Sequence, residues 1–70
     1  MTSVNVRHIL GRNVRSLRAD ARLNKVEFCL MAHISRPLLD AIEDGRANVT
    51  LDTLERIASS LAVEPWALLK

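Results

Sequence analysis

Residues 24–45 read N-K-V-E-F-C-L-M-A-H-I-S-R-P-L-L-D-A-I-E-D-G, and this stretch decides the fold because it contains two helix starts close together. Asn24, followed three residues later by Glu27, forms a capping box, which predicts that a helix begins here. Ser35 is the next N-cap. Pro37 fits the first turn of the helix that follows, because its missing N–H would have no partner within the helix.

The turn between these two helices is very short. Only His33 and Ile34 separate Ala32, where the first helix is expected to end, from the cap of the second, which ends at Gly45. The helices therefore cannot lie antiparallel and must cross at a steep angle, as in a helix-turn-helix. Six side chains that suit a packed crossing fall where one helix meets the other: Phe28, Cys29, Ala32, Ile34, Leu39 and Ile42. The apolar pattern thus supports the motif independently of the turn.

The rest of the chain also divides into helices joined by short breaks, with no alternating strand pattern and no repeat. An apolar stripe predicts a first helix from about Val6 to Ala21. Thr50 caps a fourth helix, and Pro65 begins a short fifth one. We therefore expect an all-α, compact five-helix fold in which residues 1–70 form a single domain and residues 1–5 form a flexible N-terminal segment.

Composition excludes several classes of protein. A chain of 70 residues is near the size at which a core alone can stabilise a fold, which leaves little room for an elaborate active site. Cys29 is the only cysteine, which excludes internal disulfides and cysteine-rich zinc sites and fits a reducing cytoplasm. No apolar run could span a bilayer, and residues 1–7 lack the apolar core of a signal peptide. We expect a soluble, cytoplasmic protein, and Met1 favours a complete chain.

Charge is distributed unevenly along the chain, although its net value is only +2. Residues 1–36 hold seven basic and two acidic residues, a balance of +5, whereas residues 37–70 hold three basic and six acidic residues, a balance of −3. The basic half can collect phosphate groups while the acidic half stays in solvent or faces a partner. The alternative is that these charges only form solvated helix faces.

Four segments between Leu10 and Leu69 follow a known pattern: L-G-R-N-V-R-S-L-R, A-H-I-S-R, I-E-D-G and N-V-T-L-D-T-L-E-R-I-A-S-S-L-A-V. They resemble the Cro/CI family of helix-turn-helix DNA-binding proteins, also called the XRE family, and most of all its small phage repressors and restriction-modification controller proteins. The resemblance implies a lambda-repressor-like domain. It also implies a homodimeric transcriptional regulator, a repressor or autoregulator, that binds a palindromic operator in double-stranded DNA.

The resemblance further implies which residues contact DNA. Arg36 would point at base edges, where arginine can donate two hydrogen bonds to guanine O6 and N7; a phosphate or solvent contact is the alternative. Lys25 would hold phosphate at the start of the preceding helix, although the family usually has Gln there. The full implied set is Asn24, Lys25, Ser35, Arg36, Pro37, Leu38, Asp40, Ala41, Arg46 and Asn48.

The other members of this set have implied roles of their own. Pro37 and Leu38 can offer apolar surface to a thymine methyl. Ala41 allows a close fit but does not indicate which base it would contact. Asp40 can accept a hydrogen bond from cytosine N4 but otherwise repels phosphate. On the far side, a backbone clamp is implied for the loop residues Arg46 and Asn48.

Similarity to the family also implies one structural pair and one interface. Arg18 and Glu43 match a semi-buried salt bridge between the first and third helices of similar phage repressors. Because one short helix reads too few base pairs to select a site, a two-fold contact is expected. The implied dimer interface consists of Val49, Trp66, Leu68 and Leu69. The alternative is that Trp66 only closes the bottom of the core.

The chain departs from the family pattern in two respects. His33 and Arg22 stand where glycine is usual, so positive φ is expected at both. Apolar side chains also replace common polar ones at Val26, Leu30, Met31 and Leu38. These four could form a patch that binds protein, or could cover one another around the N-terminal segment. The alternative function is therefore a protein-interaction module, an antitoxin or adaptor, with weak or no DNA binding.

Catalysis has little support in the sequence. His8 and His33 are the only histidines, and neither has a carboxylate or thiol at a spacing that indicates a triad. One thiol and two distant imidazoles do not suggest a metal site. We expect no enzymatic activity, no cofactor, no small-molecule substrate and no membrane partner.

Overall fold

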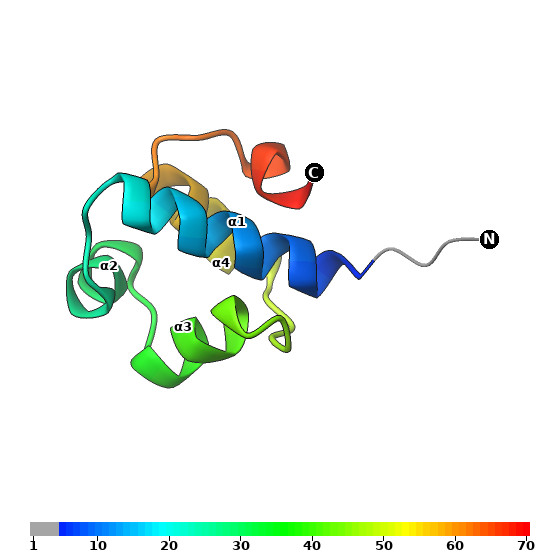
Figure 1. The fold of residues 1–70 in the computed structure, drawn as a ribbon, viewed down its shortest axis with the longest axis horizontal. Coiled ribbons are helices and arrows are strands. Elements are labelled where there is room, and N and C mark those ends of the chain that lie inside the picture. The colour runs from blue at the N-terminus through cyan, green and yellow to red at the C-terminus, as the bar shows by residue number, and fades with distance from the viewer. Residues whose placement is uncertain (1–4) are drawn as a thin grey trace.

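The computed structural model describes residues 5–70, which form four α-helices and one 3-10 helix. The elements are α1 (Val6–Asp20), α2 (Lys25–Ala32), α3 (Arg36–Glu43), α4 (Leu51–Ser60) and η1 (Pro65–Leu69). Figure 1 shows α2 and α3 on one side of α1 and η1 on the other. The all-helical class is confirmed for the described residues, and none of their helices is both long and apolar enough to cross a membrane.

The expected count of five α-helices is wrong at the last element. Residues Pro65–Leu69 form a 3-10 helix, in which the N–H of Ala67 donates to the carbonyl of Glu64 at 2.9 Å. Glu64 provides no side-chain cap, and a five-residue segment is too short to propagate α-helical hydrogen bonds. A 3-10 helix has three residues per turn, so it directs its side chains differently from the expected α-helix.

Each α-helix begins at a polar residue whose side chain accepts a backbone N–H. The predicted capping box is present, with Glu27 N–H donating to Asn24 Oδ1 at 2.8 Å and Asn24 N–H donating to Glu27 Oε1 at 2.9 Å. Ser35 and Thr50 cap α3 and α4 as predicted. Asn5 caps α1. The other residues of the expected flexible N-terminal segment, 1–4, lie outside the described residues.

Three residues other than glycine adopt the left-handed backbone conformation, each in the connection that follows an α-helix. His33 has φ of 56° and Arg22 has φ of 58°, which confirms the conformation expected from the glycines usual at these positions. The same conformation at Ala62, with φ of 57°, was not predicted. After Arg22 the N–H of Leu23 donates to the carbonyl of Arg18 at 3.2 Å, so a Schellman motif closes α1.

Replacing Arg22 with glycine should therefore stabilise the fold. A side chain with a Cβ is strained at positive φ, so Arg22→Gly should raise the free energy of unfolding by about 1 kcal/mol in urea titrations. Arg22→Ala is the matched control, because it removes the guanidinium but keeps the Cβ and should give no gain. An equal gain in both variants would show that backbone strain is not the cause.

All four α-helices and η1 contribute side chains to the core. Its fully buried large side chains are Val14, Phe28, Leu39, Ile42, Ile57 and Leu68. Of the six side chains predicted at the crossing of α2 and α3, five are buried, and only Ile34 is half-buried at the edge of the core. The helix-turn-helix is thus packed as its apolar pattern predicts.

Candidate nucleic-acid interface

The first turn of α3 presents a free cation to solvent. Ser35 Oγ accepts the N–H of Leu38 at 3.2 Å and fixes the start of the helix. Arg36 and Pro37 follow the cap and are exposed. Within residues 5–70 the Arg36 guanidinium makes no hydrogen bond or ion pair, so its five donors stay available to an external acceptor.

The next turn of α3 is only partly exposed. Leu38, Asp40 and Ala41 are all half-buried, and Leu38 and Ala41 pack against the core. Of the three, the carboxylate of Asp40 is the polar group that can reach a ligand. A close-fitting apolar surface with one carboxylate therefore lies beside Arg36.

Asp40 is bound by a lysine from the neighbouring helix. Lys25 Nζ donates to Asp40 Oδ1 at 3.0 Å, which joins the start of α2 to the middle of α3. This hydrogen bond holds the pKa of Asp40 below its ordinary value, with further help from the charges of Lys25, Arg36 and Arg46. The sequence placed Lys25 and Asp40 in one candidate set but did not predict that they pair.

The loop after α3 turns two polar side chains outward. Arg46 and Asn48 are exposed, whereas Ala47 between them is buried and anchors the loop to the core. Arg46 Nη2 lies 3.5 Å from Asp44 Oδ2, and because both side chains are more than half exposed this pair contributes little stability. Arg46 can therefore exchange Asp44 for another anion at low cost.

A buried carboxylate fixes α3 to α1. Arg18 Nε donates to Glu43 Oε2 at 2.7 Å and Nη2 to Oε1 at 3.1 Å, while Nη1 donates to the carbonyl of Leu23 at 2.9 Å. The Glu43 side chain is 1% exposed, and its hydrogen bond with Arg18 raises the pKa of that guanidinium against the effect of burial. One fork thus ties together α1, the end of α3 and the loop that enters α2.

The crossing of α1 and α3 depends on a glycine. A Cβ at Gly11 would lie 2.2 Å from the backbone oxygen of Ile42 and 3.1 Å from that of Glu43. Only a residue without a side chain permits this approach. Gly11 therefore sets the position of the C-terminal end of α3, a role that helical periodicity did not reveal.

A second positioning contact was also missed by the sequence. Arg56 on α4 donates from Nε to the carbonyl of Ala32 at 3.1 Å, at the end of α2. Its Nη2 donates to Thr53 Oγ1 at 3.2 Å. The turn of the motif is thus held from behind, and no spacing within the sequence links position 56 to position 32.

The expected dimer residues fall into two groups. Trp66 is 61% exposed, with Lys70 Nζ 4.7 Å from its ring centroid, so the alternative that Trp66 closes the core is wrong. Leu69 is 38% exposed and Val49 is half-buried. Leu68 is completely buried, so its assignment to the interface is wrong: the 3-10 helix turns this side chain into the chain's own core, where no second molecule can reach it.

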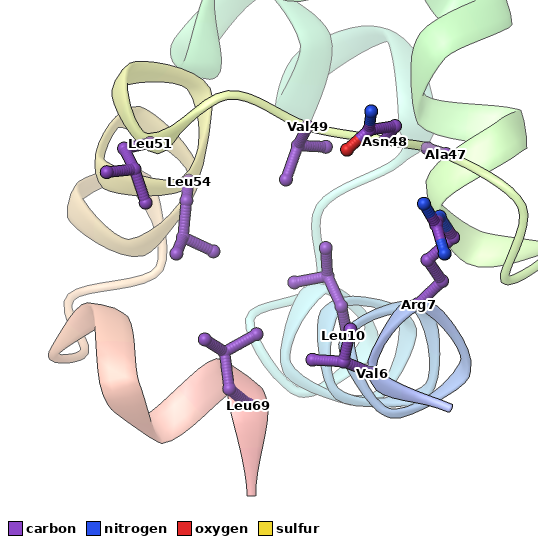
Figure 2. A pocket seen from close by; sticks show the side chains of 9 residues that line it. All are labelled: Val6, Arg7, Leu10, Ala47, Asn48, Val49, Leu51, Leu54 and Leu69. Atoms are coloured by element: carbon purple, nitrogen blue, oxygen red, sulfur yellow. The ribbon is translucent and has the colours of Figure 1, made fainter. Parts of the chain in front are cut away.

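An apolar pocket lies beside these residues. It is lined by Val6, Arg7, Leu10, Ala47, Asn48, Val49, Leu51, Leu54 and Leu69. Figure 2 shows Leu10, Leu54 and Leu69 pointing toward a common space from three different elements. Leu51, at the edge of the pocket, is 78% exposed. Val49 and Leu69 thus belong to a larger apolar surface than was expected.

The four apolar residues expected on the outside of the motif do not form one patch. Val26, Leu30 and Met31 on α2 are 54%, 73% and 49% exposed, whereas Leu38 packs against the core. The described part of the N-terminal segment begins at the end of α1 that lies away from α2 (Figure 1). Within residues 5–70, therefore, the three α2 side chains stay about half exposed or more.

Comparison with known proteins agrees with this geometry. A family model described as a helix-turn-helix domain matches residues 9–68. The chain is 32% identical over 66 residues to control protein C.BamHI of Bacillus amyloliquefaciens. The match covers 93% of this chain and 82% of that protein. It is also 32% identical over 59 residues to the immunity repressor protein of Bacillus phage phi105. That match covers 84% of this chain but only 41% of the repressor.

A solved structure extends the similarity to three dimensions. The restriction-modification controller protein C.AhdI from Aeromonas hydrophila matches with a TM-score of 0.83 and 26% identity, over 89% of this chain and 94% of that one. The resemblance to phage repressors and restriction-modification controllers that the sequence predicted is confirmed. The chain therefore belongs to the helix-turn-helix family of DNA-binding transcriptional regulators.

Proposed function

We propose that this regulator binds a palindromic operator in double-stranded DNA as a homodimer, with α3 of each subunit in the major groove. The observation that carries the proposal is Arg36, an exposed guanidinium without an internal partner, placed in the first turn of a helix fixed by Arg18 and Gly11. A positioned fork of this kind suits the O6 and N7 acceptors of guanine. The regulator acts as a repressor or autoregulator in the cytoplasm.

Phosphate contacts on both sides of α3 set the register of the helix. Asn24 and Lys25 lie at the start of α2, where free backbone N–H groups and positive charge favour an anion. Arg46 and Asn48 provide the second clamp from the loop after α3. Pro37, and the accessible part of Leu38 and Ala41, add apolar contacts to the bases. No catalysis, cofactor or small-molecule substrate is needed for this function.

Selection of duplexes from a random pool by the purified protein tests the proposal. We expect enrichment of a two-fold symmetric sequence whose half-sites contain guanine at the position read by Arg36. Binding to the enriched duplex should weaken steeply as salt rises, because each neutralised phosphate contributes a slope of about −0.9 in log K against log salt. A pool that stays random after repeated selection would refute the proposal.

The exposed face of Trp66 and Leu69, continued by Val49, is the proposed dimer contact. Tryptophan is among the residues that contribute most to interfaces, so Trp66→Ala should weaken self-association roughly 30-fold, which corresponds to about 2 kcal/mol. Sedimentation equilibrium measures this change. Because Trp66 is mostly exposed in one subunit, the control is an unchanged helical circular dichroism spectrum. Unaltered self-association in this variant would place the interface elsewhere.

The exposed Val26, Leu30 and Met31 favour a second candidate function, a protein-interaction module such as an antitoxin or adaptor. Three large apolar side chains on one short helix form a surface suited to a protein partner. Under this alternative, replacing all three with Gln would abolish a complex with a protein partner. Failure of the duplex selection above would favour it over DNA binding.

A further inference from the structure

An ion pair joins the two helices of the motif on the surface proposed to face DNA. Lys25 Nζ in the first turn of α2 lies 3.0 Å from Asp40 Oδ1 in the second turn of α3. The two side chains are 37% and 41% exposed, so solvent and ligands can reach the pair. Arg36 precedes Asp40 by one helical turn and therefore lies on the same flank of α3.

The pair limits what Lys25 can do at a phosphate. Its ammonium is already neutralised by a carboxylate, and binding a phosphate requires it to leave Asp40. The carboxylate left behind would face the negative DNA without a partner, which opposes binding. On DNA that has no hydrogen-bond donor for Asp40, the transfer of Lys25 from Asp40 to phosphate is therefore unfavourable.

A suitable base changes this balance. The N4 amine of cytosine presents a donor in the major groove, and a carboxylate is the side-chain group that accepts from it. Where this donor replaces Lys25 on Asp40, the lysine becomes free to bind a phosphate. One correct base would then yield two contacts, the base contact itself and the released cation.

We propose that Lys25 and Asp40 form an exchange pair that increases DNA selectivity: Lys25 stays on Asp40 at sequences that lack a donor for the carboxylate, and moves to phosphate where a cytosine amine takes its place. The inference rests on the proposed DNA-binding function. Asp40 would then increase selectivity in two ways. On random DNA it keeps Lys25 away from phosphate, and on the operator it accepts a hydrogen bond from the base.

Affinity for a short random-sequence duplex, measured against salt beside the duplex selected by the wild type, tests the inference. Asp40→Asn frees Lys25, so the random duplex should bind more tightly, with a salt slope steeper by roughly 0.9 for one added phosphate contact. The preference for the selected duplex should fall. Asp20→Asn is the control, because it makes the same charge change at an exposed residue at the end of α1 and should leave the preference unchanged.

A double mutant separates exchange from simple repulsion. In a Lys25→Met background no lysine can be released, so Asp40→Asn should no longer steepen the salt slope. Should Asp40→Asn steepen it equally with and without Lys25, the carboxylate acts only by repelling phosphate, and the exchange pair is overturned.

A measurement without DNA completes the test. In an NMR titration, Lys25→Met should raise the pKa of Asp40, since the hydrogen bond from Lys25 is the largest contribution to its lowering. An unchanged pKa would overturn the pair itself. A wild type that selects no duplex overturns the proposed function and this inference together, whereas one that selects an operator while Asp40→Asn keeps the same preference overturns the inference alone.

Discussion

Arg36→Ala should remove most of the preference of this protein for the proposed operator while leaving binding to random DNA nearly intact. A bidentate contact with guanine contributes roughly 1–3 kcal/mol of discrimination, so the ratio of operator to random affinity should fall about 5- to 150-fold per contact. Competition binding at fixed salt measures this ratio. The guanidinium is exposed and has no internal partner within the described residues, so its removal should not alter the fold.

Arg46→Ala is the matched control for this experiment. It also removes one exposed guanidinium, but from the loop proposed to clamp the backbone, so operator and random duplex should weaken alike and the salt slope should fall by about one. If instead Arg36→Ala weakened both duplexes equally, Arg36 would bind phosphate, which is the alternative that the sequence left open. Base readout would then have to come from the second turn of α3.

The local features of the fold were predictable because short stretches of sequence determine them. The capping box of Asn24 and Glu27 and the cap at Ser35 satisfy backbone groups within three residues, so their geometry does not depend on the rest of the chain. The left-handed conformation of His33 was expected from the glycine that the family usually has at this position. The helix-turn-helix could therefore be predicted from residues 24–45 alone.

Contacts between distant elements were not predictable in the same way. The hydrogen bond from Arg56 to the carbonyl of Ala32 depends on how α4 crosses α2, and the pairing of Lys25 with Asp40 depends on the angle between α2 and α3. Periodicity gives the face on which a side chain lies but not its partner across a crossing. These contacts position the candidate DNA surface, so its charge pattern required the structure.

The C-terminal segment illustrates the same limit. Apolar spacing in Pro65–Leu69 suggested one apolar face shared by Trp66, Leu68 and Leu69. In the 3-10 helix the tryptophan faces solvent while Leu68 is buried, because three residues per turn rotate the side chains differently from an α-helix. Asn13 fixes this arrangement, with its Nδ2 donating to the carbonyl of Leu68 at 2.9 Å. The helix type decides which residues a second subunit could contact.

Gly11→Ala should destabilise the fold, although alanine normally favours a helix over glycine. On helix propensity alone, alanine should gain about 1 kcal/mol in the interior of α1. The new Cβ would lie 2.2 Å from the carbonyl oxygen of Ile42, and since this neighbour is backbone, α1 and α3 must move apart. Overpacking of this kind costs roughly 1–3 kcal/mol or more, and the displacement also strains the fork between Arg18 and Glu43. We expect a net loss of about 2 kcal/mol in urea unfolding.

Ser16→Ala provides the matched control on the same helix. Ser16 is exposed, so alanine there changes only helix propensity and should give a small gain in stability. Opposite signs for Gly11→Ala and Ser16→Ala would identify the close approach of α1 to α3 as the cause of the loss. If both variants were stabilised, the two helices could separate without cost, and the position of α3 would not depend on the glycine. The proposed DNA-binding surface would then be held mainly by Arg18 and Glu43.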